Sequence, residues 1–299
     1  MPSNKNKQLL GYLFIAFTGV MFGSLEVASK LVPHINPFQM NFMRFLIGGI
    51  VIIPFAMYEI RSKKLKVSFG DVAYSGFLGL ILVGFSMTLM QVGISKVPAP
   101  QVAFIFASNP MIIAVLASFI LKEKPGLLTF IFIILGMTGI VFIVDPFKKA
   151  FNLDVLYPIA AVTLMGTYIV LARKLSMRLG SLFVTGTAIF LGTIGLGLFN
   201  LIIGKGLFSD IRLADVPIVF FMGAFISGLA YVTYFKGMEF INTSTGSMTF
   251  FLKAITATVL SILILKDKPE LSTYIGAAFI LAGTVVLIIS NNLKPFGKK

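Results

Sequence analysis

Hydrophobic residues run through this chain in long, uninterrupted stretches. Breaks at charged, proline-containing or polar clusters separate ten of them, near residues 9–32, 36–58, 72–94, 98–121, 126–144, 153–173, 182–204, 214–238, 243–265 and 271–290. A helix of about 20 residues crosses a hydrocarbon core of about 30 Å. The stretches do not alternate with period two, as the strands of a membrane barrel would. The pattern therefore predicts an all-α integral membrane protein with ten transmembrane helices.

Composition agrees with this prediction and removes several kinds of chemistry. Of the 299 residues, 57% are hydrophobic and 12% are charged, and the mean hydropathy is +0.97. The chain has no cysteine and a single histidine, His34, so it offers no disulfide, no thiolate nucleophile and no cysteine or histidine cluster for a metal. The sequence contains no phosphate-binding G-x-x-x-x-G-K-[ST] loop, no H-E-x-x-H and no G-x-S-x-G. We expect no enzymatic activity, no metal and no cofactor.

The lysines and arginines between the spans predict the orientation of the chain. With the N-terminus inside, 15 of them fall on the cytoplasmic side and 8 on the other. Because cytoplasmic loops carry the excess of basic residues, both termini are predicted to be cytoplasmic. The net charge of +14 then reflects topology and contact with anionic lipid headgroups. Its scatter over many loops argues against nucleic-acid binding.

The chain also repeats itself at an offset of about 144 residues. The segment LKEKP at 121–125 returns as LKDKP at 265–269, and matching residues keep one register over most of the chain. Each copy holds five predicted helices, an odd number, so the second copy must enter the membrane from the opposite side. We therefore expect two inverted five-helix repeats, 1–148 and 149–299, an arrangement typical of secondary transporters that work by alternating access. One chain supplies both halves, so a monomer is expected.

Several short motifs support this prediction. They are Phe22-Gly-Ser-Leu25 in the first span, Pro37 with Asn41-Phe-Met-Arg-Phe45 in the second, Asn109-Pro110 in the fourth, and the LKEKP and LKDKP exits. In this order and duplication they resemble the EamA-type branch of the drug/metabolite transporter superfamily over almost the whole chain. The resemblance implies export or exchange of small metabolites, often amino acids, across the bacterial inner membrane, through a cavity between the halves.

Glu26 and Arg44 are charged residues at similar depths in the first two spans. Ionisable side chains in a membrane are costly and usually face a partner or a cavity. One interpretation is a buried ion pair between the two. The other is an unpaired Glu26 that titrates and carries protons. The resemblance lends Arg44 the pairing role, while Glu26 departs from the family pattern and is similar to the first-helix glutamate of small multidrug resistance proteins in the same superfamily.

Lys253 lies about 15 Å into the ninth span, close to the membrane midplane. Its equivalent in the first repeat is Asn109, which is equally central, and transporter sites are expected at this depth. An anionic group on the cargo is the simplest partner for Lys253; pairing with Glu26 or with a backbone carbonyl is the alternative. Lys30, near the end of the first span, is expected to extend to the membrane interface.

Polar side chains that interrupt the apolar spans complete the predicted site. They are Gln91 in the third span, Tyr168 in the sixth, and Tyr231 and Tyr234 in the eighth. We expect a secondary transporter, an exporter or exchanger of a small carboxylate-bearing metabolite such as an amino acid. In it Lys253 holds the carboxylate, Asn109 and Gln91 donate hydrogen bonds, and Glu26 carries a proton or meets an amino group. The alternatives are a proton-coupled antiporter of organic cations that uses Glu26, and a lipid scramblase.

Overall fold

The computed structural model describes residues 4–122, 126–145, 152–241 and 248–293. These residues form helices and connections, and no strand occurs among them. Eight helical stretches in this part of the chain are long and apolar enough to cross a membrane. The ninth and tenth predicted spans coincide with two shorter apolar helices, Thr249–Leu265 and Leu271–Val286. The all-α membrane fold is therefore confirmed, whereas the count of ten spans and the orientation stay predictions.

Helices follow one another along the chain with short connections. Those of the first half are α1 (Asn4–Lys30), α2 (Pro37–Ser62), α3 (Phe69–Gly79), η1 (Leu80–Met87), α4 (Thr88–Lys96), α5 (Ala99–Ala107), α6 (Asn109–Ile120) and α7 (Leu127–Val144). Those of the second half are η2 (Leu153–Val155), α8 (Leu156–Leu179), α9 (Ser181–Ile202), η3 (Leu213–Asp215), α10 (Val216–Phe220), η4 (Phe221–Leu229), α11 (Ala230–Phe240), α13 (Met248–Leu260), η5 (Ser261–Leu265) and α14 (Leu271–Leu293). Part of the LKEKP motif, 123–125, and the predicted boundary at 148/149 lie outside the described residues.

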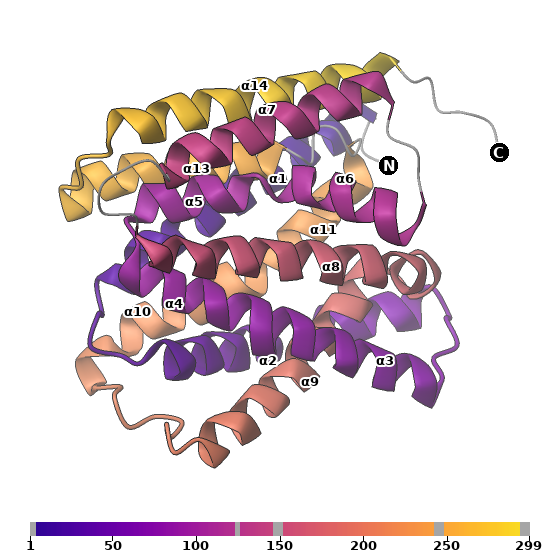
Figure 1. Cartoon of the computed structure of the whole chain (residues 1–299). Coiled ribbons are helices and arrows are strands. Elements are labelled where there is room, and N and C mark those ends of the chain that lie inside the picture. The colour runs from indigo at the N-terminus through magenta and orange to yellow at the C-terminus, as the bar shows by residue number, and fades with distance from the viewer. Residues whose placement is uncertain (1–3, 123–125, 146–151, 242–247, 294–299) are drawn as a thin grey trace.

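The helices lie roughly parallel or antiparallel in one bundle (Figure 1). We call the end at which α1 begins the near end; it holds residues 63–68 and Gly180. The far end, at which α1 finishes, holds residues 31–36, 97–98 and 203–212 and lies on the left in Figure 1. Local signals mark where helices begin. The Asn36 side chain accepts a hydrogen bond from the Phe38 amide at the start of α2, and Ser68 and Asp71 form a capping box at the start of α3.

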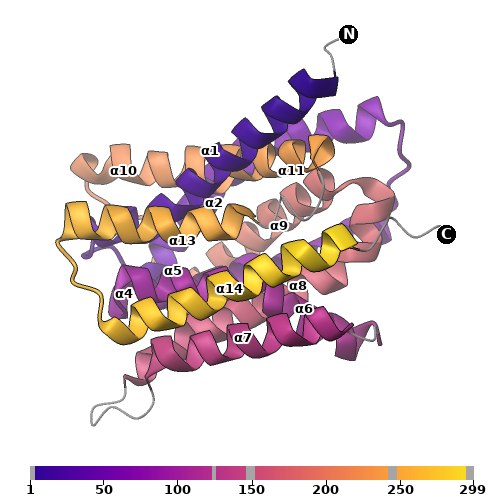
Figure 2. The same cartoon turned by 90° about the horizontal axis from the view of Figure 1, so that it is seen from above.

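Glycines let the helices approach one another closely. Helices α7 and α14 run side by side at one edge of the bundle (Figures 1 and 2). A side chain at Gly139 or at Gly276 would collide with the backbone carbonyl of the other. Gly79 of α3 packs in the same way against Gly192 of α9. Small residues are common where membrane helices touch, because lipid supplies no hydrophobic drive and close packing has to replace it.

Contacts between the halves recur at the 144-residue offset that the sequence shows. Gly79 against Gly192 has its counterpart in Gly223 packed on Ile47 and Gly48 packed on Ser227. In the same way α1 lies against α13 and α11, while α8 lies against α6 and α4. Each of these contacts between a helix of the first half and a helix of the second half thus has an equivalent contact in which the two halves are exchanged.

Two of the long helical stretches contain a π-helical segment at comparable positions. η1 interrupts the stretch 69–96, and η4 interrupts the stretch 213–240. A π-helical segment leaves some backbone carbonyls without their usual partner and is frequent at functional sites. Both segments face the centre of the bundle and contribute residues to the cavity described next.

Candidate functional site

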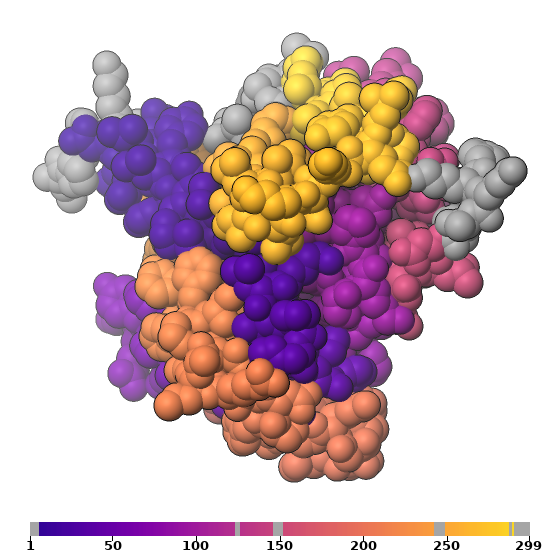
Figure 3. All heavy atoms as spheres, turned by 90° about the vertical axis from the view of Figure 1, so that its left-hand side faces the viewer, coloured from indigo at the N-terminus to yellow at the C-terminus, as the bar shows by residue number. Residues whose placement is uncertain are grey.

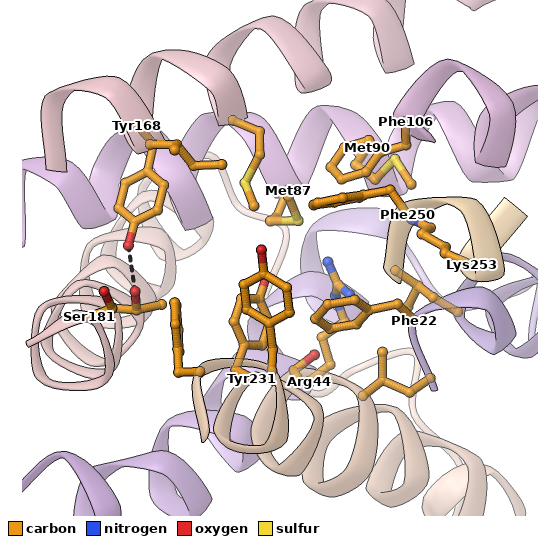
Figure 4. A pocket seen from close by; sticks show the side chains of 18 of the residues that line it. Phe22, Arg44, Met87, Met90, Phe106, Tyr168, Ser181, Tyr231, Phe250 and Lys253 are labelled. Atoms are coloured by element: carbon orange, nitrogen blue, oxygen red, sulfur yellow. Dashed lines mark hydrogen bonds between the residues drawn. The ribbon is translucent and has the colours of Figure 1, made fainter. Parts of the chain in front are cut away.

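A cavity of about 250 Å³ lies between the two halves of the bundle. Most of its wall is aromatic or sulfur-containing, and two cations, Arg44 and Lys253, reach it (Figure 4). The lining residues are Phe22, Leu25, Arg44, Met87, Met90, Phe106, Met165, Tyr168, Ile169, Ser181, Thr185, Ile226, Ser227, Tyr231, Tyr234, Phe235, Met238, Phe250 and Lys253. An apolar wall with a few polar groups is the usual composition of a small-molecule site.

Helix packing brings Glu26 of α1 to Lys253 of α13. A Cβ at Gly23 would lie 2.5 Å from the backbone oxygen of Lys253, and one at Gly19 would lie 2.8 Å from the Leu252 side chain. Only glycine permits this approach of the two backbones. One turn further along α1, Glu26 Oε1 lies 2.9 Å from Lys253 Nζ. The glycines therefore create the contact that the two charges need.

Both members of this ion pair are buried, with side-chain exposures of 0% for Glu26 and 4% for Lys253. Lys253 Nζ also lies 4.3 Å from the centre of the Phe106 ring, at a cation–π distance. Glu26 lies behind Lys253 and does not line the cavity, and its Oε2 has no hydrogen-bond partner within the described part of the chain. Glu26 therefore pairs with Lys253, one of the alternatives that the sequence left open, rather than with Arg44.

Arg44 is held by an amide instead of a carboxylate. Its Nε and Nη2 donate to Asn41 Oδ1 over 3.2 and 3.1 Å. Asn41 Nδ2 in turn donates to the Val83 carbonyl at 3.0 Å and to Thr88 Oγ1 at 2.9 Å. Asn41 thus ties α2 to the π-helical segment η1 and orients the guanidinium. Among the described residues Arg44 has no carboxylate partner within 4.0 Å, so its charge is not neutralised by direct pairing.

Hydroxyl groups occupy other parts of the wall. Tyr168 of α8 and Thr185 of α9 share a hydrogen bond of 2.9 Å between their oxygens (Figure 4). Ser227 of η4 is buried, and its Oγ has no hydrogen-bond partner in the described structure. Tyr231 and Tyr234 lie three residues apart on one face of α11 and both line the cavity. The predicted tyrosines therefore meet Lys253 and Arg44 at one site.

The cavity borders a second hollow at one end of the bundle. Ser181, Phe235 and Met238 line both this cavity and the hollow at the near end. Toward the far end, the described residues include none that line both the central cavity and the hollow there. Figure 3 views the far end and shows the α1–α2 connection, in indigo, between the segment before α10, in orange, and the α13–α14 connection, in yellow. The central cavity thus lies next to the near-end hollow and shares no described lining residue with the far-end one.

Three residues considered from the sequence lie away from the central cavity. Asn109 is the first residue of α6, and Pro110, which follows it, interrupts the helix between α5 and α6. Asn109 is fully buried, and its side-chain amide has no hydrogen-bond partner in the described structure. Gln91 of α4 lines the far-end hollow. Lys30 lines the same hollow and is partly exposed, and its extension to the membrane interface stays a prediction.

Sequence reasoning missed other lining residues. Met87, Met90 and Met165 have no polar atom that would distinguish them from lipid-facing or core residues in an apolar span. Ser227 carried a signal, since it is a hydroxyl inside the apolar eighth span. For the methionines, sequence spacing alone held no comparable signal.

A central cavity between two halves of a helical membrane bundle is typical of a membrane transporter. The pattern of the EamA-like transporter family matches residues 9–145 and again residues 153–289. The chain therefore belongs to the EamA-like transporter family, within the drug/metabolite transporter superfamily. It is a multi-pass membrane transporter of a small molecule.

Individual relatives extend over nearly the full length. An uncharacterized transporter of Clostridium kluyveri is 30% identical over 94% of each chain. An S-adenosylmethionine uptake transporter of Rickettsia prowazekii is 24% identical over 89% of this chain and 87% of its own. A crystal structure with 17% sequence identity superimposes with a TM-score of 0.66 over 98% of this chain and 99% of that one. That similarity shows a common fold.

Proposed function

We propose that this protein is a secondary active transporter of a small carboxylate-bearing metabolite, such as an amino acid, in the bacterial inner membrane. The observation that carries the proposal is the charge balance of the central cavity. Two buried cations, Arg44 and Lys253, reach the cavity, and among the described residues the Glu26 carboxylate forms its ion pair with Lys253. With Glu26 ionised, one positive charge stays uncompensated, and burial makes that charge costly until an anion arrives.

Arg44 is the cation best placed to receive the carboxylate. A guanidinium has five N–H donors and binds carboxylates in a bidentate manner, and only two of its nitrogens here donate to Asn41. Lys253 adds a second positive charge, which is also paired with the Glu26 carboxylate. The aromatic and methionine wall suits an apolar or aromatic remainder of the solute, and the volume of about 250 Å³ favours a small one.

The equivalent contacts of the two predicted halves, 1–148 and 149–299, support transport by alternating access. Among the described residues, contacts between the halves recur at the 144-residue offset. The cavity borders the hollow at the near end, the predicted cytoplasmic side. A second state with the contacts of the halves exchanged would open the far end. The S-adenosylmethionine transporters among the relatives suggest one solute to test, because that compound combines an amino-acid group with an aromatic base.

Thermal stability of the detergent-purified protein tests the charge argument, because a ligand that binds the folded state raises its melting temperature. The panel contains amino acids, organic acids, organic cations and S-adenosylmethionine. Carboxylates should stabilise the natural protein. The shift should disappear in Arg44→Gln, which removes the excess charge. It should persist in the double variant Glu26→Gln/Lys253→Met, which removes one charge of each sign.

The same panel separates the alternative function. A proton-coupled antiporter of organic cations would be stabilised by cations in the natural protein and in Arg44→Gln, but not in Glu26→Gln. That result would overturn the carboxylate proposal. The pairing of Glu26 with Lys253 argues against it, since the carboxylate already has a cation at 2.9 Å.

A further inference from the structure

A second cavity of about 290 Å³ lies at the far end of the bundle. The near-end hollow that borders the central site lies at the opposite end. The far-end cavity is bordered by the end of α1, the start of α2, α4 and the connection after η5. Its polar members are Ser29, Lys30, Gln91, Ser95 and Asp267. The described residues that line it are all different from those of the central cavity.

The charges of this cavity are balanced, unlike those of the central one. Lys30 supplies one positive charge and Asp267 one negative charge, and Asp267 acts electrostatically on Lys30. The two do not approach within the 4.0 Å of an ion pair in the described structure. Asp267 is held in place by a hydrogen bond from the Ser261 hydroxyl. Opposite charges kept apart at one cavity leave room for a solute that carries both.

Gln91 provides an independent indication of a ligand. Its side chain is 4% exposed, and its Oε1 is buried without a hydrogen-bond partner in the described structure. Buried polar atoms almost always have partners, and an unpaired acceptor favours a bound donor. The neighbouring hydroxyls are already used: Ser29 donates to the Met222 sulfur and Ser95 to the Val92 carbonyl. An ammonium group would satisfy Gln91 and Asp267 together.

We propose that the far-end cavity is a second solute site, which binds the zwitterionic headgroup of an amino acid. Lys30 receives the carboxylate, and Asp267 with Gln91 Oε1 receives the ammonium group. The inference rests on the proposed function and deepens it, because a balanced pair of charges selects a zwitterion over a simple organic acid. A solute at this site would lie across the Glu26–Lys253 pair from the central cavity, where it would wait for entry or follow release.

A cysteine reporter tests this site, and the chain is free of natural cysteines. In Ser95→Cys, the rate of modification by the uncharged reagent methyl methanethiosulfonate is measured on detergent-purified protein by mass spectrometry. The additives are the twenty common amino acids and, as matched analogues of leucine, 4-methylpentanoate without the ammonium and 3-methylbutylamine without the carboxylate. At least one amino acid should slow the reaction severalfold. If leucine is among them, neither of its analogues should protect; for another amino acid, its own deaminated and decarboxylated analogues are used.

Variants in the Ser95→Cys background locate the effect. Protection should be lost in Lys30→Met and in Asp267→Asn. It should be kept in the control Lys96→Met, which removes a far-end cation that pairs with Asp154 and does not line the cavity. It should also be kept in Arg44→Gln, which disables the central site alone.

Three results would overturn the second site: no amino acid protects, the deaminated analogue protects as well as its amino acid, or protection survives both Lys30→Met and Asp267→Asn. The Arg44-dependent thermal shift keeps this failure separate from failure of the proposed function. If carboxylates stabilise the protein through Arg44 while no amino acid protects Ser95→Cys, only the second site is refuted. If neither effect is seen, the carboxylate proposal fails as well.

Discussion

The two ends of the bundle hold equivalent ion pairs that differ in one residue. At the near end, Arg178 of α8 binds Asp71 at the start of α3. At the far end, His34 after α1 lies 2.9 Å from Asp215 of η3. The positions correspond at the 144-residue offset, 34 with 178 and 71 with 215. In both pairs the aspartate also caps its own helix, through Ser68 at one end and Arg212 at the other.

The arginine at the near end and the histidine at the far end show how two similar halves can form unlike ends. A guanidinium is a fixed cation with five N–H donors, whereas an imidazole offers two ring nitrogens. The far end is tied further by Gln39, whose amide donates to the Lys205 carbonyl and accepts from the Asp210 amide. If the halves exchange roles during transport, the two ends are therefore held by different contacts.

The largest effect on stability is expected from the Glu26–Lys253 pair, which lies between the two ends of the bundle. Lys253→Met leaves Glu26 buried without its cation and should lower the free energy of unfolding by about 3–5 kcal/mol. The double variant Glu26→Gln/Lys253→Met should recover most of this loss, since it removes both charges. Melting temperatures in detergent measure both. An equal loss in the single and double variants would show that packing of the lysine stem matters more than charge.

An intermediate effect should follow from breaking one end at a time. Asp215→Asn and Asp71→Asn each weaken a charge-assisted contact, while an asparagine can still cap the helix. Under alternating access the two should act in opposite directions on the far-end reporter Ser95→Cys. Its modification should become faster with Asp215→Asn and slower with Asp71→Asn. A change in the same direction for both would mean that the pairs stabilise the fold without setting the conformation.

The smallest effect is expected from making the two ends alike. His34→Arg places a guanidinium beside Asp215, as Arg178 lies beside Asp71 at the near end. Because the His34 side chain is partly exposed, the gain in stability should be small. The Ser95→Cys reporter should be modified more slowly in the His34→Arg background.

The control for this measurement is His34→Gln, which removes the ring but keeps a hydrogen-bond donor. Modification of Ser95→Cys in the His34→Arg background that is as fast as in His34→Gln would contradict a role for the charge at position 34 in holding the far end.

Much of this protein follows from local features of its sequence. Apolar stretches of membrane length dictate helices, because backbone groups in lipid must bond within their own segment. The motifs from Phe22 to LKDKP indicated the family before any contact was known. Lys253, Tyr168, Tyr231 and Tyr234 are predicted as site residues because polar groups stand out in an apolar span, and all four line the central cavity.

Only the tertiary structure decided which groups meet. The sequence placed Glu26 and Arg44 at similar depths, yet Glu26 pairs with a lysine more than 200 positions away, because glycines bring α1 against α13. Gln91 lines the far-end cavity, and Asn109 lines neither cavity although it is central in its span. Depth along a helix follows from residue number, but rotation and partner depend on how distant helices pack. The cost of burying a charge indicates that a partner is needed, but it does not indicate which residue the partner is.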